Sequence, residues 1–260
     1  MEISFVIGVL GNIFASLLFI SPAKTFWRIV KKRSTEEFES IPYIILLLNA
    51  SLWTYYGIIK PELLLVTING FGAALGVIYV FIYLLFAPSK IKVKTFAMVG
   101  TLNVGFLVGA ILITSFAMSR HAQVNTAGIL CVCITIISFG SPLAVMKTVV
   151  TTKSVEFMPF FLTFFYFLVA TTWGLYGILI HDTFILIPNS IGFFLGVAQL
   201  SLYAWYRNYP KPSEIKDDDL EEGKPRKSED FVLEEIKPAK SEDCVLKVGK
   251  PNEHLNNNAP

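Results

Sequence analysis

Two tryptophans and two asparagines lie inside long apolar stretches, where polar side chains are costly. Trp53 precedes Asn69 by 16 residues, Trp173 precedes Asn189 by 16 residues, and the two pairs are 120 positions apart. An indole offers a flat apolar face, and an amide both donates and accepts hydrogen bonds. Together they suit a ligand with a C–H face and a rim of hydroxyls. We therefore interpret the four residues as a clamp for a neutral polyol.

Each residue type also has a simpler interpretation. An Asn in a membrane bundle often bonds a neighbouring helix, because leaving its amide unsatisfied in hydrocarbon costs several kcal/mol. A Trp often marks the membrane interface, although Trp53 lies about 18 Å from one end of its span. The symmetric placement, with glycine three and seven residues after each asparagine, favours a shared pocket.

Membrane spans must position these residues. Of the 260 residues, 53% are hydrophobic and only 16% are charged, and the mean hydropathy is +0.58. Seven apolar stretches are long enough to cross a bilayer, at 5–27, 41–59, 63–86, 95–117, 126–149, 157–180 and 184–206. Of the 20 acidic residues, 13 follow residue 206. The chain is thus expected to be an all-α membrane protein with a disordered tail at 207–260.

Basic residues predict the orientation of the spans. The connections after spans 1, 3 and 5 contain nine Lys and Arg, whereas those after spans 2, 4 and 6 contain two. Positive charge is retained on the cytoplasmic side of a membrane. We expect a lumenal or external N-terminus and a cytoplasmic tail.

An internal repeat relates the two halves of the membrane region. An offset of 120 residues aligns the Trp and Asn pairs, Ser-Pro at 21–22 with 141–142, and Tyr-Gly at 56–57 with 176–177, while Pro42 matches Pro159 at an offset of 117. Four crossings separate equivalent points, so the two halves run parallel. We predict a first three-helix bundle at 1–89, a linker helix at 90–122 and a second bundle at 123–206.

Residues 5–206 resemble the SWEET sugar transporters, the MtN3/saliva family, whose members are parallel-repeat transporters. The motifs that carry the resemblance are GNIFASLLFISPAKTFWRIVKKRSTEEFESIPY, WTYYG, TINGFG, SPLAVMKTVVTTKSVEFMPF and IPNSIGFFLG. It implies that the Trp and Asn pairs form the central substrate site. It also implies four wall positions, which are Leu18, Asn49, Ser138 and Val169. Because Leu18 and Asn49 are not small, we favour a monosaccharide over a disaccharide.

The resemblance also implies moving parts at both mouths. Four prolines are expected near the cytoplasmic mouth, where a proline inside a helix favours a kink; they are Pro22, Pro42, Pro142 and Pro159. We expect hinges, with static kinks as the alternative. At the other mouth, Tyr56, Tyr176 and Asp182 are expected to form a lumenal gate by Tyr–Asp closure. An aromatic belt beside a solvated carboxylate is the alternative.

The spans contain no ionisable residue at midplane depth, where such residues normally mark ion or proton pathways. We therefore expect a bidirectional facilitator, a uniporter, and neither catalysis, cofactor nor metal. A proton-coupled PQ-loop-type amino-acid exporter and a sucrose-transporting family member remain alternatives, although Ser-Pro replaces Pro-Gln at 21–22 and 141–142. A G-protein-coupled receptor should lack the repeat, and a cargo-retrieval receptor should contain charged residues to capture its cargo.

The motifs STEEF, SLWTYYGI, NGFGA and HDTFILIPN are most similar to the plant vacuolar-type subgroup. This implies transport of fructose or glucose across the tonoplast rather than the plasma membrane. Membrane lipid and the sugar are the expected partners; a net charge of +2 gives no sign of nucleic acid, and small three-helix repeats leave homo-oligomers open. In the tail, KSEDFVL recurs as KSEDCVL at 240–246. We interpret this duplication as a plain solvated repeat, as a pair of phosphorylation sites at Ser228 and Ser241, or as a sorting signal.

Overall fold

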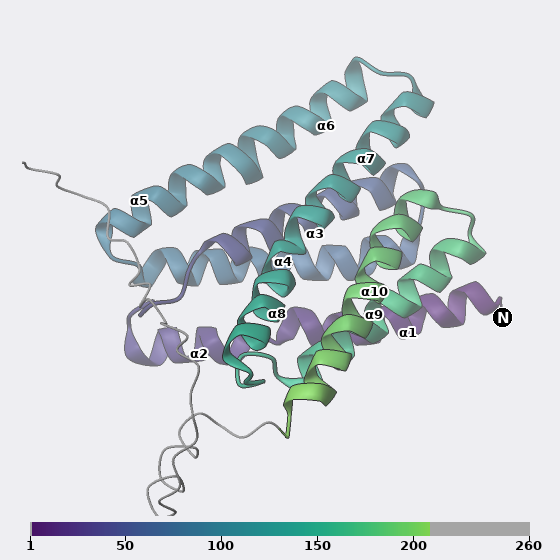
Figure 1. The fold of residues 1–260 in the computed structure, drawn as a ribbon. Coiled ribbons are helices and arrows are strands. Elements are labelled where there is room, and N and C mark those ends of the chain that lie inside the picture. The colour runs from purple at the N-terminus through teal and green to yellow at the C-terminus, as the bar shows by residue number, and fades with distance from the viewer. Residues whose placement is uncertain (1, 209–260) are drawn as a thin grey trace, which may run out of the picture. The chain divides into compact units, whose positions relative to one another are not determined.

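The structure of the protein, a computed structural model, describes residues 2–208 and consists of helices only in that range (Figure 1). The helices are α1 (Ile3–Ile20), α2 (Ala23–Lys32), α3 (Ile41–Ile59), α4 (Leu63–Phe86), α5 (Ser89–Met98), the π-helix η1 (Val99–Phe106), α6 (Leu107–Phe116), α7 (Arg120–Ser138), α8 (Gly140–Thr152), α9 (Phe160–Leu179) and α10 (Thr183–Tyr206). The predicted tail, with Ser228 and Ser241, lies outside the described residues.

These helices form seven segments that are long and apolar enough to span a membrane: Ile3–Lys32, Ile41–Ile59, Leu63–Phe86, Ser89–Phe116, Arg120–Thr152, Phe160–Leu179 and Thr183–Tyr206. The expected all-α, seven-span fold is therefore confirmed. The second and third spans coincide with the predicted ranges. The first, fourth and fifth spans are longer than predicted, because helical turns with polar residues extend the apolar stretch, after it as α2 in the first span and mainly before it in the fourth and fifth.

Span 1 breaks at Ser21-Pro22, and span 5 breaks at Phe139, two residues before the equivalent Ser141-Pro142. Pro22 stands between α1 and α2, and Pro142 lies in the first turn of α8, just after the break that follows α7. The repeat is also seen in the backbone at the ends of α2 and α8. These helices end on Arg33 and Lys153, which are 120 positions apart and have left-handed φ angles of 53° and 51°.

The other two prolines lie where helices begin. Pro42 is in the first turn of α3, and Pro159 immediately precedes α9. A proline at these positions removes no hydrogen bond from the helix, since the first amides of a helix have no intrahelical acceptor. Pro22 and Pro142 also begin helices, but each lies inside a single span next to the break between its two helices, so the expected kink applies to these two and not to Pro42 and Pro159.

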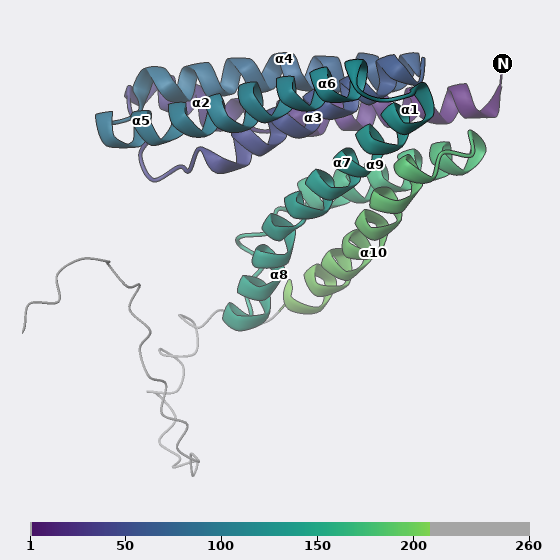
Figure 2. The ribbon, with the colours of Figure 1, turned by 90° about the horizontal axis from the view of Figure 1, so that it is seen from above.

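Helices pack both within and between the two halves. α3 packs on α4 and α9 on α10, and Figure 2 shows α8 beside α10. Between the halves, α1 packs on α9 and α7 on α3. Gly8 and Gly128, which are repeat mates, permit equivalent close approaches: a Cβ would lie 2.6 Å from Leu64 at the first and 2.5 Å from Phe184 at the second.

The connections between the helices lie on two opposite sides of the bundle, the N-terminal side and the basic side. The N-terminal side holds the N-terminus and the α3–α4, α6–α7 and α9–α10 connections (Figure 1). The basic side holds the α2–α3, α4–α5 and α8–α9 connections, to which the predicted basic clusters belong. Each transmembrane helix thus has one end on each side.

Candidate functional site

The structure brings the two tryptophans into a single cluster of packed side chains. Trp53 is 7% exposed and Trp173 is 5% exposed, and both belong to a core that also contains Tyr56 and Tyr176. Each indole meets a tyrosine edge-on, with ring centroids 5.6 Å apart for Trp53–Tyr56 and 5.2 Å apart for Trp173–Tyr176. The repeat thus yields two equivalent Trp–Tyr units that meet between the halves.

The two indole N–H groups have different surroundings. Trp53 Nε1 donates to Thr135 Oγ1 at 3.0 Å, and that hydroxyl lies 2.9 Å from Asn49 Oδ1. Trp173 Nε1 has no hydrogen-bond partner within residues 2–208 and faces Gly11, where a Cβ would lie 3.0 Å away. The first tryptophan therefore lies beside a polar wall that joins both halves, and the second lies against Gly11 of α1.

The two asparagines use their amides in the same way. Asn69 Nδ2 donates to the Leu65 carbonyl at 3.0 Å, and Asn189 Nδ2 donates to the Ile185 carbonyl at 2.7 Å. Both bonds lie within the residue's own helix, and among the described residues neither amide bonds a neighbouring helix. In residues 2–208 each Oδ1 has no hydrogen-bond partner.

The remaining predicted wall positions differ in their contacts. Val169, the repeat mate of Asn49, packs against the tryptophan cluster. Ser138 donates to the Ile134 carbonyl of its own helix at 2.8 Å. Leu18 lines a cavity on the basic side. Asn49 and Val169 thus lie near the tryptophans, whereas Leu18 lies closer to the mouth.

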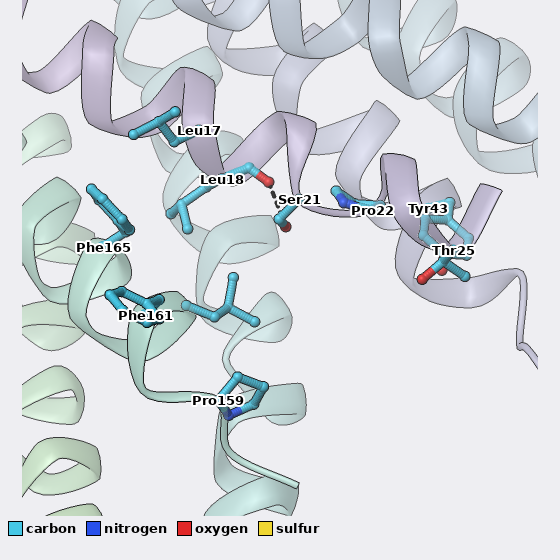
Figure 3. Close-up of a pocket in the computed structure, with 10 residues that line it drawn as sticks. Leu17, Leu18, Ser21, Pro22, Thr25, Tyr43, Pro159, Phe161 and Phe165 are labelled. Carbon is cyan, nitrogen blue, oxygen red and sulfur yellow. Dashed lines mark hydrogen bonds between the residues drawn. The ribbon is translucent and has the colours of Figure 1, made fainter. Parts of the chain in front are cut away.

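That cavity has a volume of about 670 Å³ and lies between α1, α2, α3 and α9. Figure 3 shows Leu18 and Pro22 from one wall and Pro159 from the other, with Phe161 beside it. Its lining is mostly apolar, and Phe161 is 74% exposed. Two of the four predicted hinge prolines therefore line a cavity between the halves, while Pro42 and Pro142 do not belong to this lining.

On the N-terminal side, tyrosines and carboxylates of opposite halves are bonded to one another. Tyr56 Oη donates to Asp182 at 2.8 Å and 3.1 Å from its two carboxylate oxygens. Tyr176 Oη donates to Glu62 at 2.8 Å. The tyrosines are 120 positions apart, as are the carboxylates. We call this pair of contacts the crossed latch.

Asp182 has more donors than Glu62. Its carboxylate is 1% exposed, caps α10 by accepting from the amides of Phe184 and Ile185, and lies 2.7 Å from Lys60 Nζ. A carboxylate taken out of water must be compensated in this way, because its desolvation is costly. The latch therefore has a buried, ionic arm at Asp182 and a simpler arm at Glu62.

Several of these residues were not predicted from the sequence. Glu62 could have been found, because the offset of 120 residues pairs it with Asp182. Lys60 and Thr135 could not, since their repeat mates are Ile180 and Ala15, which cannot form the same contacts. Contacts that only one of the two halves makes therefore cannot be predicted from the sequence repeat.

A second polar cluster, also unpredicted, ties the linker to both halves on the N-terminal side. Gln123 Nε2 of α7 donates to Tyr55 Oη of α3 at 2.8 Å, and the same tyrosine lies 2.6 Å from Thr114 Oγ1 of α6. Arg120 donates to Gln123 and to the Ile59 carbonyl. We call these residues the linker cluster.

Comparison with known proteins identifies relatives of this chain. The family described as "sugar efflux transporter for intercellular exchange" matches residues 5–91 and 125–211. The chain is 52% identical to bidirectional sugar transporter SWEET16 of Arabidopsis thaliana over 80% of this chain and 91% of that one. It is 50% identical to SWEET17 of the same plant over 85% and 95% of the two chains.

A solved structure agrees with these sequence matches. The 3.7 Å structure of a eukaryotic SWEET transporter is 38% identical, with a TM-score of 0.76 over 78% of this chain and 96% of the other. The two family matches also fall on the two halves of the repeat, with the linker helix between them. The chain therefore belongs to the SWEET (MtN3/saliva) family of sugar transporters.

Proposed function

We propose that this protein is a bidirectional facilitative transporter that moves a monosaccharide such as fructose or glucose down its gradient. The crossed latch is the observation that carries the proposal, because it closes one side of a two-fold repeat whose other side has a cavity. Its relatives are named bidirectional sugar transporters. Alternating access requires that such a closure form on each side in turn.

The sugar binds between the two halves, beside the tryptophan cluster. The indole faces contact its C–H groups, and the free Oδ1 atoms of Asn69 and Asn189 accept hydrogen bonds from its hydroxyls. Asn49 is held by Thr135 and Leu18 lines the cavity, so neither makes room for a second sugar ring. These contacts support a monosaccharide over sucrose.

During transport the latch opens while the basic side closes. Opening separates Tyr56 and Lys60 from Asp182, and Tyr176 from Glu62. Water then hydrates the released carboxylates and offsets much of the lost bonding. The breaks beside Pro22 and Pro142 fall within about one helical turn of equivalent points in the two halves and let the helix ends on the basic side move together.

We assign the N-terminal side to the vacuolar lumen and the basic side to the cytosol. The distribution of Lys and Arg supports this orientation, and the similarity to the vacuolar-type subgroup supports the tonoplast. In this orientation the structure is closed to the lumen. The lack of ionisable residues at midplane depth supports transport without proton coupling.

Uptake into proteoliposomes tests this function. The full chain is reconstituted, and initial uptake of labelled fructose, glucose and sucrose is measured with and without a pH gradient. We expect uptake of a monosaccharide that exceeds sucrose and ignores the pH gradient. Uptake that requires the pH gradient would favour a coupled transporter, and no uptake of any of the three would contradict sugar transport.

A further inference from the structure

A second groove lies on the outer face of the first half, away from the substrate cavity. It has a volume of about 290 Å³ and is formed by α1 and α2 on one wall and α4 on the other. Its floor is the stacked pair Phe26 and Tyr79, whose ring centroids are 4.5 Å apart. Tyr79 Oη also donates to the Phe19 carbonyl at 2.9 Å, which holds α4 against α1. The floor is therefore rigid and buried.

The walls of the groove are apolar and open outward. They consist of Ile20, Ala23, Trp27, Val30, Leu75, Ile78 and Ile82. Trp27 is 74% exposed and Ile78 is 49% exposed within the protein. Along α4, Leu75 and Ile82 lie about 18 and 29 Å from the first residue. In a hydrocarbon core of about 30 Å the α4 wall of the groove thus lies in the half toward the basic side, at the depth of acyl chains, whereas Trp27 and Val30 on α2 lie nearer the headgroups.

Two cations flank the groove without an acidic partner. On α2, Lys24 and Lys31 lie three residues before and four residues after Trp27, so all three share one face of the helix. Both lysines are exposed, and neither has an ion-pair partner within residues 2–208. From the start of α1, Lys24 and Lys31 lie about 31 and 42 Å along the helices, at the edge of the core and in the headgroup layer.

The other cations of α2 are already paired. Arg28 lies 2.6 Å and Lys32 lies 2.5 Å from Glu36. Hydrogen bonds from Lys32 and Arg28 hold the pKa of Glu36 below its ordinary value, so this carboxylate stays ionised and its partners stay neutralised. The unneutralised charge of α2 is therefore concentrated on the face with the groove.

The second half lacks these features. The positions equivalent to Lys24, Trp27 and Lys31 are Ala144, Lys147 and Thr151. The fold itself, which is repeated, does not require the two lysines or the tryptophan. The combination is a property of the first half alone, as expected of a site with a ligand of its own.

We propose that this groove binds one anionic phospholipid of the leaflet on the basic side, with an acyl chain on the Phe26–Tyr79 floor and the phosphate between Lys24 and Lys31. An apolar α4 wall at hydrocarbon depth, with free cations at the edge of the core and in the headgroup layer, matches the two parts of such a lipid. Trp27 lies at the level of the headgroups, where its indole is most stable. The bound lipid holds α2 against α4.

Native mass spectrometry of the full chain tests this assignment. The protein is released from detergent with equal amounts of phosphatidylglycerol and phosphatidylcholine of identical acyl chains. We expect the wild type to retain one phosphatidylglycerol preferentially. The double variant Lys24→Gln/Lys31→Gln should weaken that retention about 10- to 30-fold, from the attraction of each basic residue to an anionic headgroup. The variant Ala23→Trp, which fills the groove and keeps both lysines, should weaken retention of the lipid as well.

Lys147→Gln is the matched control, because it removes one positive charge at the position equivalent to Trp27 in the second half. It should retain the lipid as the wild type does, and thermal unfolding in phosphatidylcholine alone checks that every variant is folded. Equal retention of the two lipids by the wild type would overturn the proposal. The proposal would also be overturned if the double variant kept its preference for phosphatidylglycerol, or if Lys147→Gln lost as much bound lipid as the double variant does. A dimer of the protein that is detected in the wild type and disappears in Ala23→Trp would overturn it too.

Discussion

Tyr176 of the second half donates a hydrogen bond to Glu62 of the first half, at 2.8 Å, and so mirrors the bond between Tyr56 and Asp182. Each tyrosine comes from the last turn of a helix in one half and each carboxylate from the N-cap of a helix in the other. The two bonds therefore cannot persist when the halves separate on this side. The closure is shared by both repeats rather than built by one of them.

The Glu62 arm of the latch can be removed by Tyr176→Phe. A hydrogen bond to a charged group contributes about 1.5–3 kcal/mol, so its loss should shift the balance toward the form that is open on the N-terminal side by roughly tenfold or more. The shift is measured as the fraction of long distances between spin labels at Leu63 and Thr183, which are exposed repeat mates at the starts of α4 and α10. An unchanged distance distribution would contradict the role of this arm.

The Asp182 arm should be the stronger of the two. Asp182→Asn keeps the cap of α10 but removes the charge that Lys60 and Tyr56 contact. Because Asp182 is fully buried in the closed form, we expect its substitution to favour the open form more than Tyr176→Phe does. The free energy of opening should fall by about 1–2 kcal/mol more. The same pair of spin labels measures it. A smaller opening than in Tyr176→Phe would reverse the order assigned to the two arms.

The polar wall beside Trp53 should affect sugar binding. Thr135→Val removes the hydroxyl that Trp53 Nε1 and Asn49 Oδ1 both contact. With these groups reoriented, we expect the KM for the monosaccharide to rise about five- to tenfold, while the melting temperature changes little. Thr54→Val is the control, because the Thr54 hydroxyl bonds only the Ala50 carbonyl of its own helix. If the two variants had equal KM values, Thr135 would have a role in helix packing and none in sugar binding.

The linker cluster should affect stability rather than transport. Gln123→Ala leaves Tyr55 and Arg120 without a shared partner. Side-chain hydrogen bonds between membrane helices contribute about 0.6–1.7 kcal/mol each, so the variant should unfold at a lower temperature with its KM unchanged. Thermal unfolding and uptake, measured on the same preparation, check both statements. A raised KM at an unchanged melting temperature would contradict them.

Much of this architecture follows from composition and repetition. Apolar length determines the spans at 41–59 and 63–86, where the predicted ends agree with the structure. Tyr56 and Asp182 were expected to meet because the resemblance links them, and they do. The same logic extends to Tyr176 and Glu62, since a parallel repeat makes each contact twice.

Other features have no periodic signal in the sequence. Thr135 acts on a tryptophan 82 residues away in the other half, and its own mate is an alanine. Lys60 completes the Asp182 arm alone, because isoleucine stands at the equivalent position. The extent of α2 was missed because its surface is basic, and an apolar window ends where charged residues begin. Such contacts depend on how the halves are docked.

The distance between spin labels at Leu63 and Thr183, measured in transport-active protein with and without saturating fructose or glucose, tests the central claim most directly. Labelled protein is first shown to take up the sugar in proteoliposomes. The account predicts two populations of distance, the short one from the closed latch, with a ratio that the sugar changes. A single short distance that sugar leaves unchanged, in protein that still transports, would contradict an opening latch.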